Sequence, residues 1–454
     1  MPFLSVNPTT EQTLQEFPAH TRAQVEEALA LSAKAASIWR STSFEQRGGL
    51  MVEAAGILER EGTAIATMLT TEMGKTLAAA KGEVAKCATT MRYYAAHAQA
   101  MLSDESIVSS ASRSGVRFDP LGAVFAVMPW NFALWQVIRF AAPSLMAGNV
   151  GILKHASNVP QSANFLEDLF RRAGFPDGCF INLFLTHDDV PLVIADDRVA
   201  AVTLTGSEGV GRTIAQLAGE NLKKCVLELG GSDAFIVAKS ADLAFTVPMA
   251  VTARIQNNGQ SCIAAKRFIV VRERADEFVA SFVEGMKSAV VGDPLDVATN
   301  VGPLATAAQR DLIAQQVEKS VAAGATLLCG GVRPEGKGFF YPPTVLTDVP
   351  AQSPAGCEEL FGPVAVVRVV DGLDEAIAVA NETPWGLGGS IWASDAREIE
   401  RAIAGIDAGM VYANAIVASS PELPFGGIKN SGYGRELSTM GIREFTNAKT
   451  FYVA

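Results

Sequence analysis

The order of strands and helices after residue 120 constrains the fold of this 454-residue chain more than any other feature. Short runs rich in β-branched and aromatic residues occupy 122–128, 149–154, 199–206 and 225–231, and the segments between them are compatible with helices. Strands that alternate with helices form parallel sheets, because each helical crossover returns the chain along a face of the sheet. The sequence therefore predicts an α/β unit of the kind that commonly holds dinucleotides.

The flanking regions extend this prediction. The first hundred residues favour helices, with Thr21 as a helix cap. Residues 114–130 favour extended segments around a turn at Asp119 and Pro120. The last fourteen residues favour a helix and then a strand. A second α/β domain is predicted to begin near residue 232, from six further strand-like runs: 234–240, 266–272, 325–331, 364–370, 389–394 and 409–415.

Composition narrows the class of protein. Hydrophobic residues make up 49% and charged residues 19%, as in soluble globular proteins, and the net charge of −11 disfavours a nucleic-acid or anionic-membrane binder. The N-terminus shows no export signal, and no apolar run is long enough to span a bilayer, so we expect a cytoplasmic protein. The four histidines are dispersed, which predicts no metal site, and the six cysteines are too scattered for a disulfide framework: Cys87, Cys179, Cys225, Cys262, Cys329 and Cys357.

Cys262 is the candidate for chemistry, because it directly follows Asn-Asn-Gly-Gln-Ser. It is either a small buried residue before a core strand or a nucleophile at a tight turn. No histidine lies near another candidate motif, which disfavours a Cys/His protease. Glu228 lies at a strand end before two glycines, and it is either a general base or an ordinary acid that caps a helix or lies at the surface. Asn131 places an amide at a strand's carboxyl end, where α/β proteins bind ligands. The glycines of 205–211 lack the G-x-G-x-x-G spacing, so that segment favours a plain strand-to-helix turn.

Six motifs, in order, resemble the aldehyde dehydrogenase superfamily over nearly the full length: PWNF (129–132), LTGS (204–207), LELGG (227–231), NNGQSC (257–262), EELFGPV (358–364) and PFGGIKNSGYGRE (424–436). Further segments, such as EMGKTLAAAK and QSCIAAKRF, are similar to those of short bacterial succinate-semialdehyde dehydrogenases. The resemblance implies an α/β fold with a Rossmann-type cofactor domain, an α/β catalytic domain and a small β element that pairs subunits into homodimers or homotetramers. The expected boundaries are 1–101 with 121–231 for the cofactor domain, 232–425 for the catalytic domain, and 102–120 with 426–454 for the oligomerisation element.

The resemblance also implies a reaction and its residues. The Cys262 thiolate would attack an aldehyde, the Asn131 amide and the Cys262 backbone N–H would hold the oxyanion, and Glu228 would activate the water that hydrolyses the resulting thioester. The expected cofactor-binding residues are Trp130, Lys154, Ser157, Gly206, Ser207, Gly211, Leu229, Glu359 and Phe361. The expected substrate-binding residues are Trp135, Arg139 and Ser419.

Ser157 bears on the choice of nicotinamide cofactor. Many NAD-dependent relatives carry a glutamate at this position, which accepts hydrogen bonds from ribose hydroxyls and repels a 2′-phosphate. A serine does not repel the phosphate, and Lys154 is then free to pair with it. We therefore expect NADP to be preferred and NAD tolerated; the alternative is that Ser157 only removes a contact and allows dual use.

Arg139 bears on the choice of aldehyde. In a helix it would lie about 12 Å beyond Asn131, with Trp135 on the same stripe, and its guanidinium could hold a carboxylate at the far end of the substrate. The alternative is a helix arginine in a structural ion pair. Succinic semialdehyde is therefore the expected substrate, although Gln256 stands where some such enzymes carry another arginine. Glutaric semialdehyde or a medium-chain aldehyde is the alternative substrate. Two other classes of protein, a non-catalytic binding protein and a coenzyme-A acylating enzyme, are disfavoured because Cys262, Asn131 and Glu228 are all present.

Overall fold

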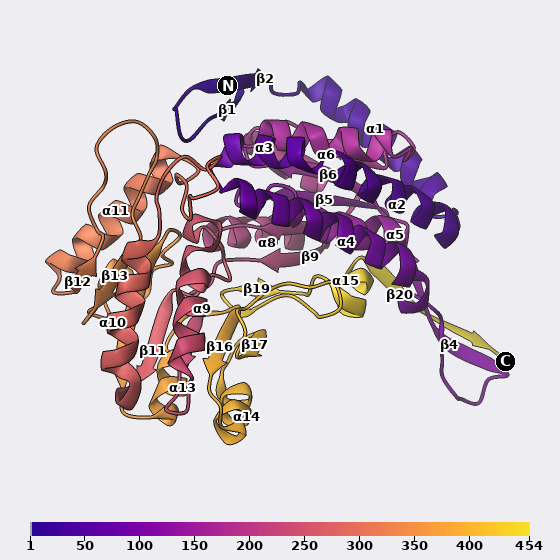
Figure 1. Ribbon diagram of the computed structural model, residues 1–454. Coiled ribbons are helices and arrows are strands. Elements are labelled where there is room, and N and C mark those ends of the chain that lie inside the picture. Colours follow the sequence, from indigo (N-terminus) through magenta and orange to yellow (C-terminus); the bar gives the residue numbers. More distant parts are fainter. Residues whose placement is uncertain (1) are drawn as a thin grey trace.

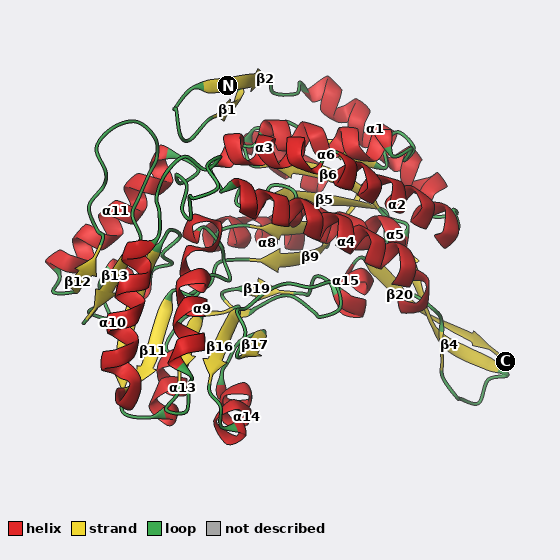
Figure 2. Cartoon of the chain, viewed as in Figure 1, coloured by secondary structure: helices red, strands yellow, loops and turns green. Residues whose placement is uncertain are grey.

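The first alternating series folds into a six-stranded sheet in the computed structural model, which describes residues 2–454 (Figures 1 and 2). All neighbouring strands are parallel except β19, which runs antiparallel to β9. The central strands β5 and β6 are buried along their whole length, as expected for parallel strands covered on both faces. The order across the sheet is β19 (Gly432–Tyr433), β9 (Lys224–Glu228), β8 (Val199–Thr205), β5 (Ala123–Met128), β6 (Val150–His155) and β7 (Phe180–Asn182). The predicted α/β architecture is confirmed; β7 and β19 were not predicted because they are too short to show a pattern.

Helices cover this sheet, and the N-terminal region and the crossovers between strands supply four each (Figure 1). The Thr21 side chain accepts a hydrogen bond from the Gln24 N–H, so the predicted cap is confirmed. The N-terminal helices are α1 (Arg22–Trp39), α2 (Phe44–Arg60), α3 (Gly62–Met73) and α4 (Leu77–Met101). The crossover helices are α5 (Trp135–Ala147), α6 (Pro160–Arg172), α7 (Val190–Ala195) and α8 (Glu208–Glu220). A hairpin of β1 (Phe3–Val6) and β2 (Thr13–Phe17) precedes them and was not predicted.

The second alternating series forms a seven-stranded sheet, parallel except for the pair β12 and β13. Strands β9 and β10 follow each other in the chain but lie in different sheets. The order is β12 (Thr326–Cys329), β13 (Thr344–Thr347), β14 (Val364–Val370), β11 (Arg267–Val271), β10 (Ala234–Val237), β16 (Gly388–Trp392) and β17 (Met410–Ala413). The helices of this part are α9 (Leu243–Ile255), α10 (Arg272–Ser288), α11 (Ala307–Ala322), α12 (Pro354–Cys357), α13 (Leu373–Asn381) and α14 (Ala396–Gly405).

A three-stranded ribbon of β3 (Glu105–Ser106), β4 (Arg113–Pro120) and β20 (Thr446–Val453) extends away from both sheets and ends at the C-terminus (Figures 1 and 2). The helix α15 (Ser438–Glu444) leads into it, as the sequence predicts, and the small pair β15 (Trp385–Gly386) and β18 (Ile428–Lys429) lies near the second sheet. The prediction of a turn at Asp119 and Pro120 is wrong, because both residues pair with β20. The chain turns afterwards, at Leu121 and Gly122, where Gly122 has a φ of 132°.

Within residues 2–454, no helix combines the length and the apolar character that crossing a membrane requires.

Candidate active site

Cys262 follows a turn whose backbone is held in the left-handed region. Asn257, Asn258 and Gly259 have φ values of 52°, 59° and 75°. Asparagine tolerates this conformation better than most residues, and glycine adopts it freely. A side chain at position 259 would also lie 2.3 Å from the carbonyl carbon of Gly362. The Asn-Asn-Gly sequence before the cysteine is therefore what this turn requires.

Buried side chains fix the turn from two sides. The Asn258 amide donates to the carbonyls of Gly74 and Pro303, at 2.8 and 2.9 Å. The Lys266 ammonium donates to the Cys262 carbonyl at 2.5 Å. Lys266 was not among the predicted site residues, although it lies only four residues after the cysteine, within the segment QSCIAAKRF. The turn is rigidly placed, as a nucleophile requires.

Asn131 lies just beyond β5 and contacts the same turn. Its amide nitrogen donates to the Gln260 carbonyl at 3.1 Å, and the Asn257 amide donates to the Asn131 carbonyl at 2.8 Å. The second N–H of the Asn131 side-chain amide donates to no other described residue. The Cys262 backbone N–H likewise donates no hydrogen bond within residues 2–454. Two hydrogen-bond donors are thus available next to the cysteine.

Two cavities meet at Cys262, which lines both together with Gln136. We name them after one residue each. The Asn131 cavity, of about 240 Å³, lies over the carboxyl ends of β5, β8 and β9. The Trp135 cavity, of about 250 Å³, lies between α4, α5 and residues 417–425.

The Asn131 cavity holds most of the predicted cofactor residues. The rings of Trp130 and Phe361 meet edge to face in its wall, with centroids 5.8 Å apart. Three predicted residues are outside the lining: Lys154 is buried at the end of β6, Ser157 is exposed in the next turn, and Gly211 lies within α8 against Leu229. The predicted residues that line the cavity are Trp130, Gly206, Ser207, Leu229, Glu359 and Phe361.

This cavity fits a dinucleotide. Helix α8 begins at its wall, and the Ser207 side chain does not cap the helix, so the first backbone N–H groups of α8 are available to a phosphate. Glu359 contributes a carboxylate that accepts from the Gly231 N–H at 3.2 Å and pairs with Lys266 at 3.3 Å. A Cβ at position 230 would lie 2.4 Å from a carboxylate oxygen of Glu359, so a side chain there would displace this carboxylate. A carboxylate beside an uncapped helix start suits a ribose next to a pyrophosphate.

Glu228 ends β9, and its carboxylate lies behind the cavities. Glu228 is not among the described residues that line either cavity, although Leu229 and Gly230, which follow it in the chain, line the Asn131 cavity. Burial raises its pKa well above the ordinary value, and the neighbouring Glu436 raises it further. Neither carboxylate oxygen has a hydrogen-bond partner among the described residues. The buried position of Glu228 therefore favours the protonated form of its carboxyl group.

The Cys262 thiol is held mainly in its protonated form. Burial raises its pKa to about 11, while the positive charges of Arg139 and Lys266 act in the opposite direction. The sulfur still faces both cavities. A ligand that adds positive charge or donors at this junction would favour the reactive thiolate.

Arg139 forms the ion pair that the sequence left open as an alternative. Its guanidinium pairs with Glu436, donates to the Thr205 hydroxyl at 3.3 Å, and lies 4.3 Å from the centre of the Phe425 ring. It also lines the Trp135 cavity. Helix α5 begins only at Trp135, so residues 131–134 form a turn rather than the continuous helix on which the 12 Å separation was based.

The other predicted substrate residues share the Trp135 cavity with a residue that was not predicted. Trp135 and Ser419 line it, and Gln256 lies there too. The additional residue is Lys86, on α4. Because 333 positions separate Lys86 from Ser419, the sequence offered no spacing signal that could link them.

His155, whose role the sequence does not explain, ties β6 to the turn that carries Asn131. Its Nδ1 accepts from the Ala156 N–H at 2.9 Å, so Nε2 carries the proton and donates to the Ala133 carbonyl at 2.8 Å. Burial lowers its pKa to about 4. His155 is therefore a neutral positioning residue.

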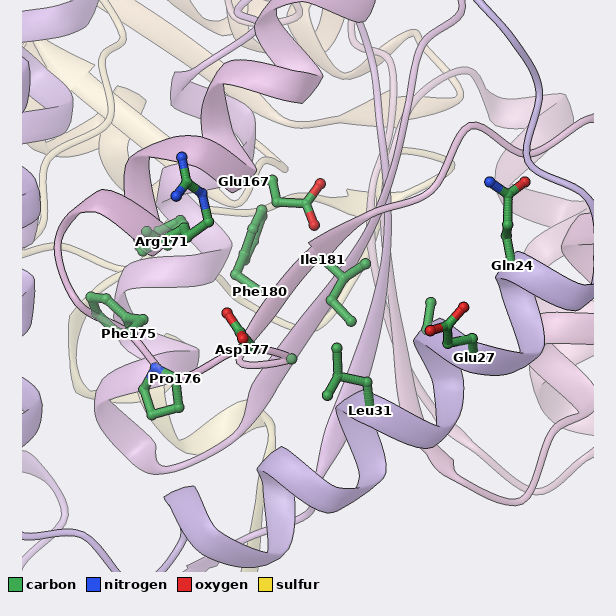
Figure 3. A pocket seen from close by; sticks show the side chains of 13 residues that line it. Gln24, Glu27, Leu31, Glu167, Arg171, Phe175, Pro176, Asp177, Phe180 and Ile181 are labelled. Atoms are coloured by element: carbon green, nitrogen blue, oxygen red, sulfur yellow. The ribbon is translucent and has the colours of Figure 1, made fainter.

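A third cavity, of about 260 Å³, lies away from this site, between α1, the end of α6 and the start of β7 (Figure 3). Carboxylates of Glu27, Glu167 and Asp177 and the guanidinium of Arg171 surround it. It includes none of the predicted site residues.

Comparisons with known proteins agree with this geometry. Residues 2–451 match the model of the aldehyde dehydrogenase family. A succinate-semialdehyde dehydrogenase [NADP(+)] of Mycobacterium avium is 54% identical over 457 residues, covering 100% of this chain and 97% of the relative. Succinate-semialdehyde dehydrogenase [NADP(+)] 1 of Mycobacterium tuberculosis is 53% identical, with 100% of both chains covered. The crystal structure of succinic semialdehyde dehydrogenase from Streptococcus pyogenes in complex with NADP+ superimposes with a TM-score of 0.97, at 38% identity and 99% coverage of each chain. The chain belongs to the aldehyde dehydrogenase family.

Proposed function

We propose that the protein oxidises succinic semialdehyde to succinate, with NADP as the preferred cofactor and NAD tolerated. The observation that carries this proposal is the position of Cys262, between a cavity suited to a dinucleotide and a cavity lined with cations. The full-length relatives named for this activity support it.

The proposed reaction uses this chain's residues as follows. The Cys262 thiolate forms a bond to the aldehyde carbon, and the Asn131 amide and the Cys262 N–H donate to the oxygen that becomes negative. Trp130, Ser207 and Glu359, which line the Asn131 cavity, would hold a nicotinamide cofactor there, and its chemistry would be to take up the hydride from that carbon. The product on the enzyme is a thioester of Cys262. Water then attacks the thioester, Glu228 takes its proton, and the C–S bond breaks to release the acid and restore the thiolate.

Glu228 has two positions in this scheme. The buried position favours its protonated form, whereas a base must be ionised. We propose that its side chain rotates about its bonds toward Cys262 once the thioester has formed, where a more solvated setting lets it lose its proton.

Initial rates with a panel of aldehydes test the substrate. We expect kcat/KM for succinic semialdehyde to exceed that for glutaric semialdehyde by about 10-fold, since one methylene is worth about 1–3 kcal/mol. We expect a larger excess over butanal, which has no carboxylate. A higher kcat/KM for butanal or for glutaric semialdehyde would contradict the proposed substrate.

Ser157→Glu tests the choice of cofactor. A carboxylate at this exposed turn, beside Lys154 at the end of β6, would repel a 2′-phosphate and accept from ribose hydroxyls. We expect the ratio of kcat/KM for NADP to that for NAD to fall by about 10- to 100-fold, because each 1.4 kcal/mol or so of repulsion between the two negative charges lowers the ratio tenfold. Ser157→Ala is the control. An unchanged ratio would show that Ser157 does not govern selectivity.

We also propose the division of the chain that the sequence suggests: residues 1–101 with 121–231 as cofactor domain, 232–425 as catalytic domain, and 102–120 with 426–454 as oligomerisation element. The ribbon of β3, β4 and β20 supports the last assignment, because it extends away from the body of the chain (Figure 1). Apolar side chains are exposed on it: Tyr452 and Val453 in β20, and Val108 in the loop between β3 and β4. Residues 432–433, by contrast, add a strand to the cofactor sheet. A homodimer or homotetramer is proposed, and a monomeric mass by light scattering would contradict it. All six cysteines are free thiols, which supports a cytoplasmic location.

A further inference from the structure

We propose that Lys86, together with Ser419, binds the carboxylate at the far end of the aldehyde and so sets the preference for acidic aldehydes. This inference rests on the proposed function and names a cation that the sequence did not identify. It follows from four observations on the Trp135 cavity.

The first observation is the position of Lys86. It lies on α4 and lines the same cavity as Cys262. Its ammonium donates to the Ser419 hydroxyl at 2.6 Å and lies 4.2 Å from the centre of the Trp135 ring. Two residues expected to contact the substrate thus converge on this one nitrogen.

The second observation is that the half-buried Lys86 has no carboxylate partner within residues 2–454. The acid that lines the cavity, Glu83, is already engaged: it pairs with Lys75 and accepts from the backbone N–H groups of Leu134 and Trp135, both at 2.9 Å. Burial without an anion is costly for an ammonium group. An anionic ligand in the cavity would remove that cost.

The third observation is that Arg139 is less available than Lys86. The Arg139 guanidinium is neutralised by Glu436 and fixed by Thr205 and Phe425. Arg139 therefore forms part of the wall of the Trp135 cavity, and its positive charge is balanced by Glu436. Lys86 is the cation in this cavity whose charge is not already balanced.

The fourth observation is the chemistry of Ser419. Its oxygen accepts from Lys86, which leaves its own O–H free to donate. An ammonium and a hydroxyl side by side can each donate to one carboxylate oxygen. Gln256, in the wall of the same cavity, is uncharged and does not compete with Lys86 for an anion.

The pKa of the Lys86 ammonium also bears on its role in binding a carboxylate. Burial lowers its pKa to about 8, the charge of Arg139 lowers it further, and Cys87, Glu83 and Cys262 act in the opposite direction. The proton on Lys86 is lost as the pH rises through this value. Binding of an acidic aldehyde should weaken over the same range, whereas binding of an uncharged aldehyde should not.

Lys86→Met, which keeps the length of the side chain, tests the proposal with two substrates. We expect kcat/KM for succinic semialdehyde to fall by about 10- to 100-fold, the range for a hydrogen bond to a charged group, and that for butanal to change less than about threefold. Lys81→Met, an exposed lysine on the same helix, is the matched control and should leave both values unchanged. Lys86→Arg should restore part of the preference. An equal loss for both substrates, or no loss, would overturn the role of Lys86.

The unmodified protein provides a test that does not depend on the variant folding. The ratio of kcat/KM for succinic semialdehyde to that for butanal cancels the ionisation of Cys262, which both substrates require. We expect this ratio to fall as the pH rises through about 8, the value at which Lys86 loses its proton, and a constant ratio up to pH of about 9.5 would overturn the proposal. If wild-type protein does not oxidise succinic semialdehyde at all, the proposed function fails; if it does and the ratio is insensitive to Lys86 and to pH, only the present inference fails.

Discussion

Cys262→Ala is expected to lower kcat with succinic semialdehyde by about 10⁴-fold or more, because no other group can form the covalent intermediate. Alanine removes the sulfur but leaves the turn intact, since the turn is held by Asn258 and by the ammonium of Lys266, which bonds to the backbone of residue 262. The melting temperature should therefore stay within a few degrees of the wild-type value. NADPH absorbance at saturating substrate measures the loss.

Cys357→Ala is the matched control for this experiment. Its thiol is exposed on α12 and takes no part in either cavity. We expect full activity from it. Substantial turnover by Cys262→Ala, or an equal loss in both variants, would show that Cys262 is not the nucleophile.

Glu228→Gln is expected to separate the two halves of the reaction. Formation of the thioester does not need a base at position 228, so a first-turnover burst of NADPH should persist. Hydrolysis does need it, so steady-state turnover should fall by about 10²- to 10⁴-fold, the usual contribution of a general base. Stopped-flow absorbance measures both phases, with the enzyme concentrated enough that one NADPH per active site is detectable.

The pH dependence of the slow phase adds a check. Because burial and Glu436 raise the pKa of Glu228, its ionised fraction grows as the pH rises. The wild-type hydrolysis rate should increase with pH, and that of Glu228→Gln should depend on pH much less. Glu220→Gln, on the exposed side of α8, should behave as wild type. Loss of the burst in Glu228→Gln would contradict the assigned role.

Much of the fold follows from the sequence, because strands buried on both faces are continuous apolar runs. Strands β5, β6, β8 and β14 fall within two residues of their predicted bounds for this reason. Strands of two or three residues, such as β7 and β19, carry no such signal. The pairing of Asp119 with Asn447 was missed because it joins segments more than three hundred residues apart.

The candidate site is predictable only in part. Cys262, Asn131 and Glu228 lie in local motifs at strand or turn ends, and those motifs mark them. The contacts of Lys86 with Ser419 and of Arg139 with Glu436 join distant segments, so only the folded chain reveals which cation is balanced and which is not. Whether Arg139 is engaged could not be decided from helix spacing alone.

Mass spectrometry of Glu228→Gln, quenched within one turnover with succinic semialdehyde and NADP, tests the central claim most directly. Covalent chemistry at the junction of the two cavities predicts a succinyl group on the peptide that contains Cys262, in an amount equal to the NADPH of the burst. A burst of NADPH with that peptide unmodified, or with the succinyl group on another cysteine, would contradict it.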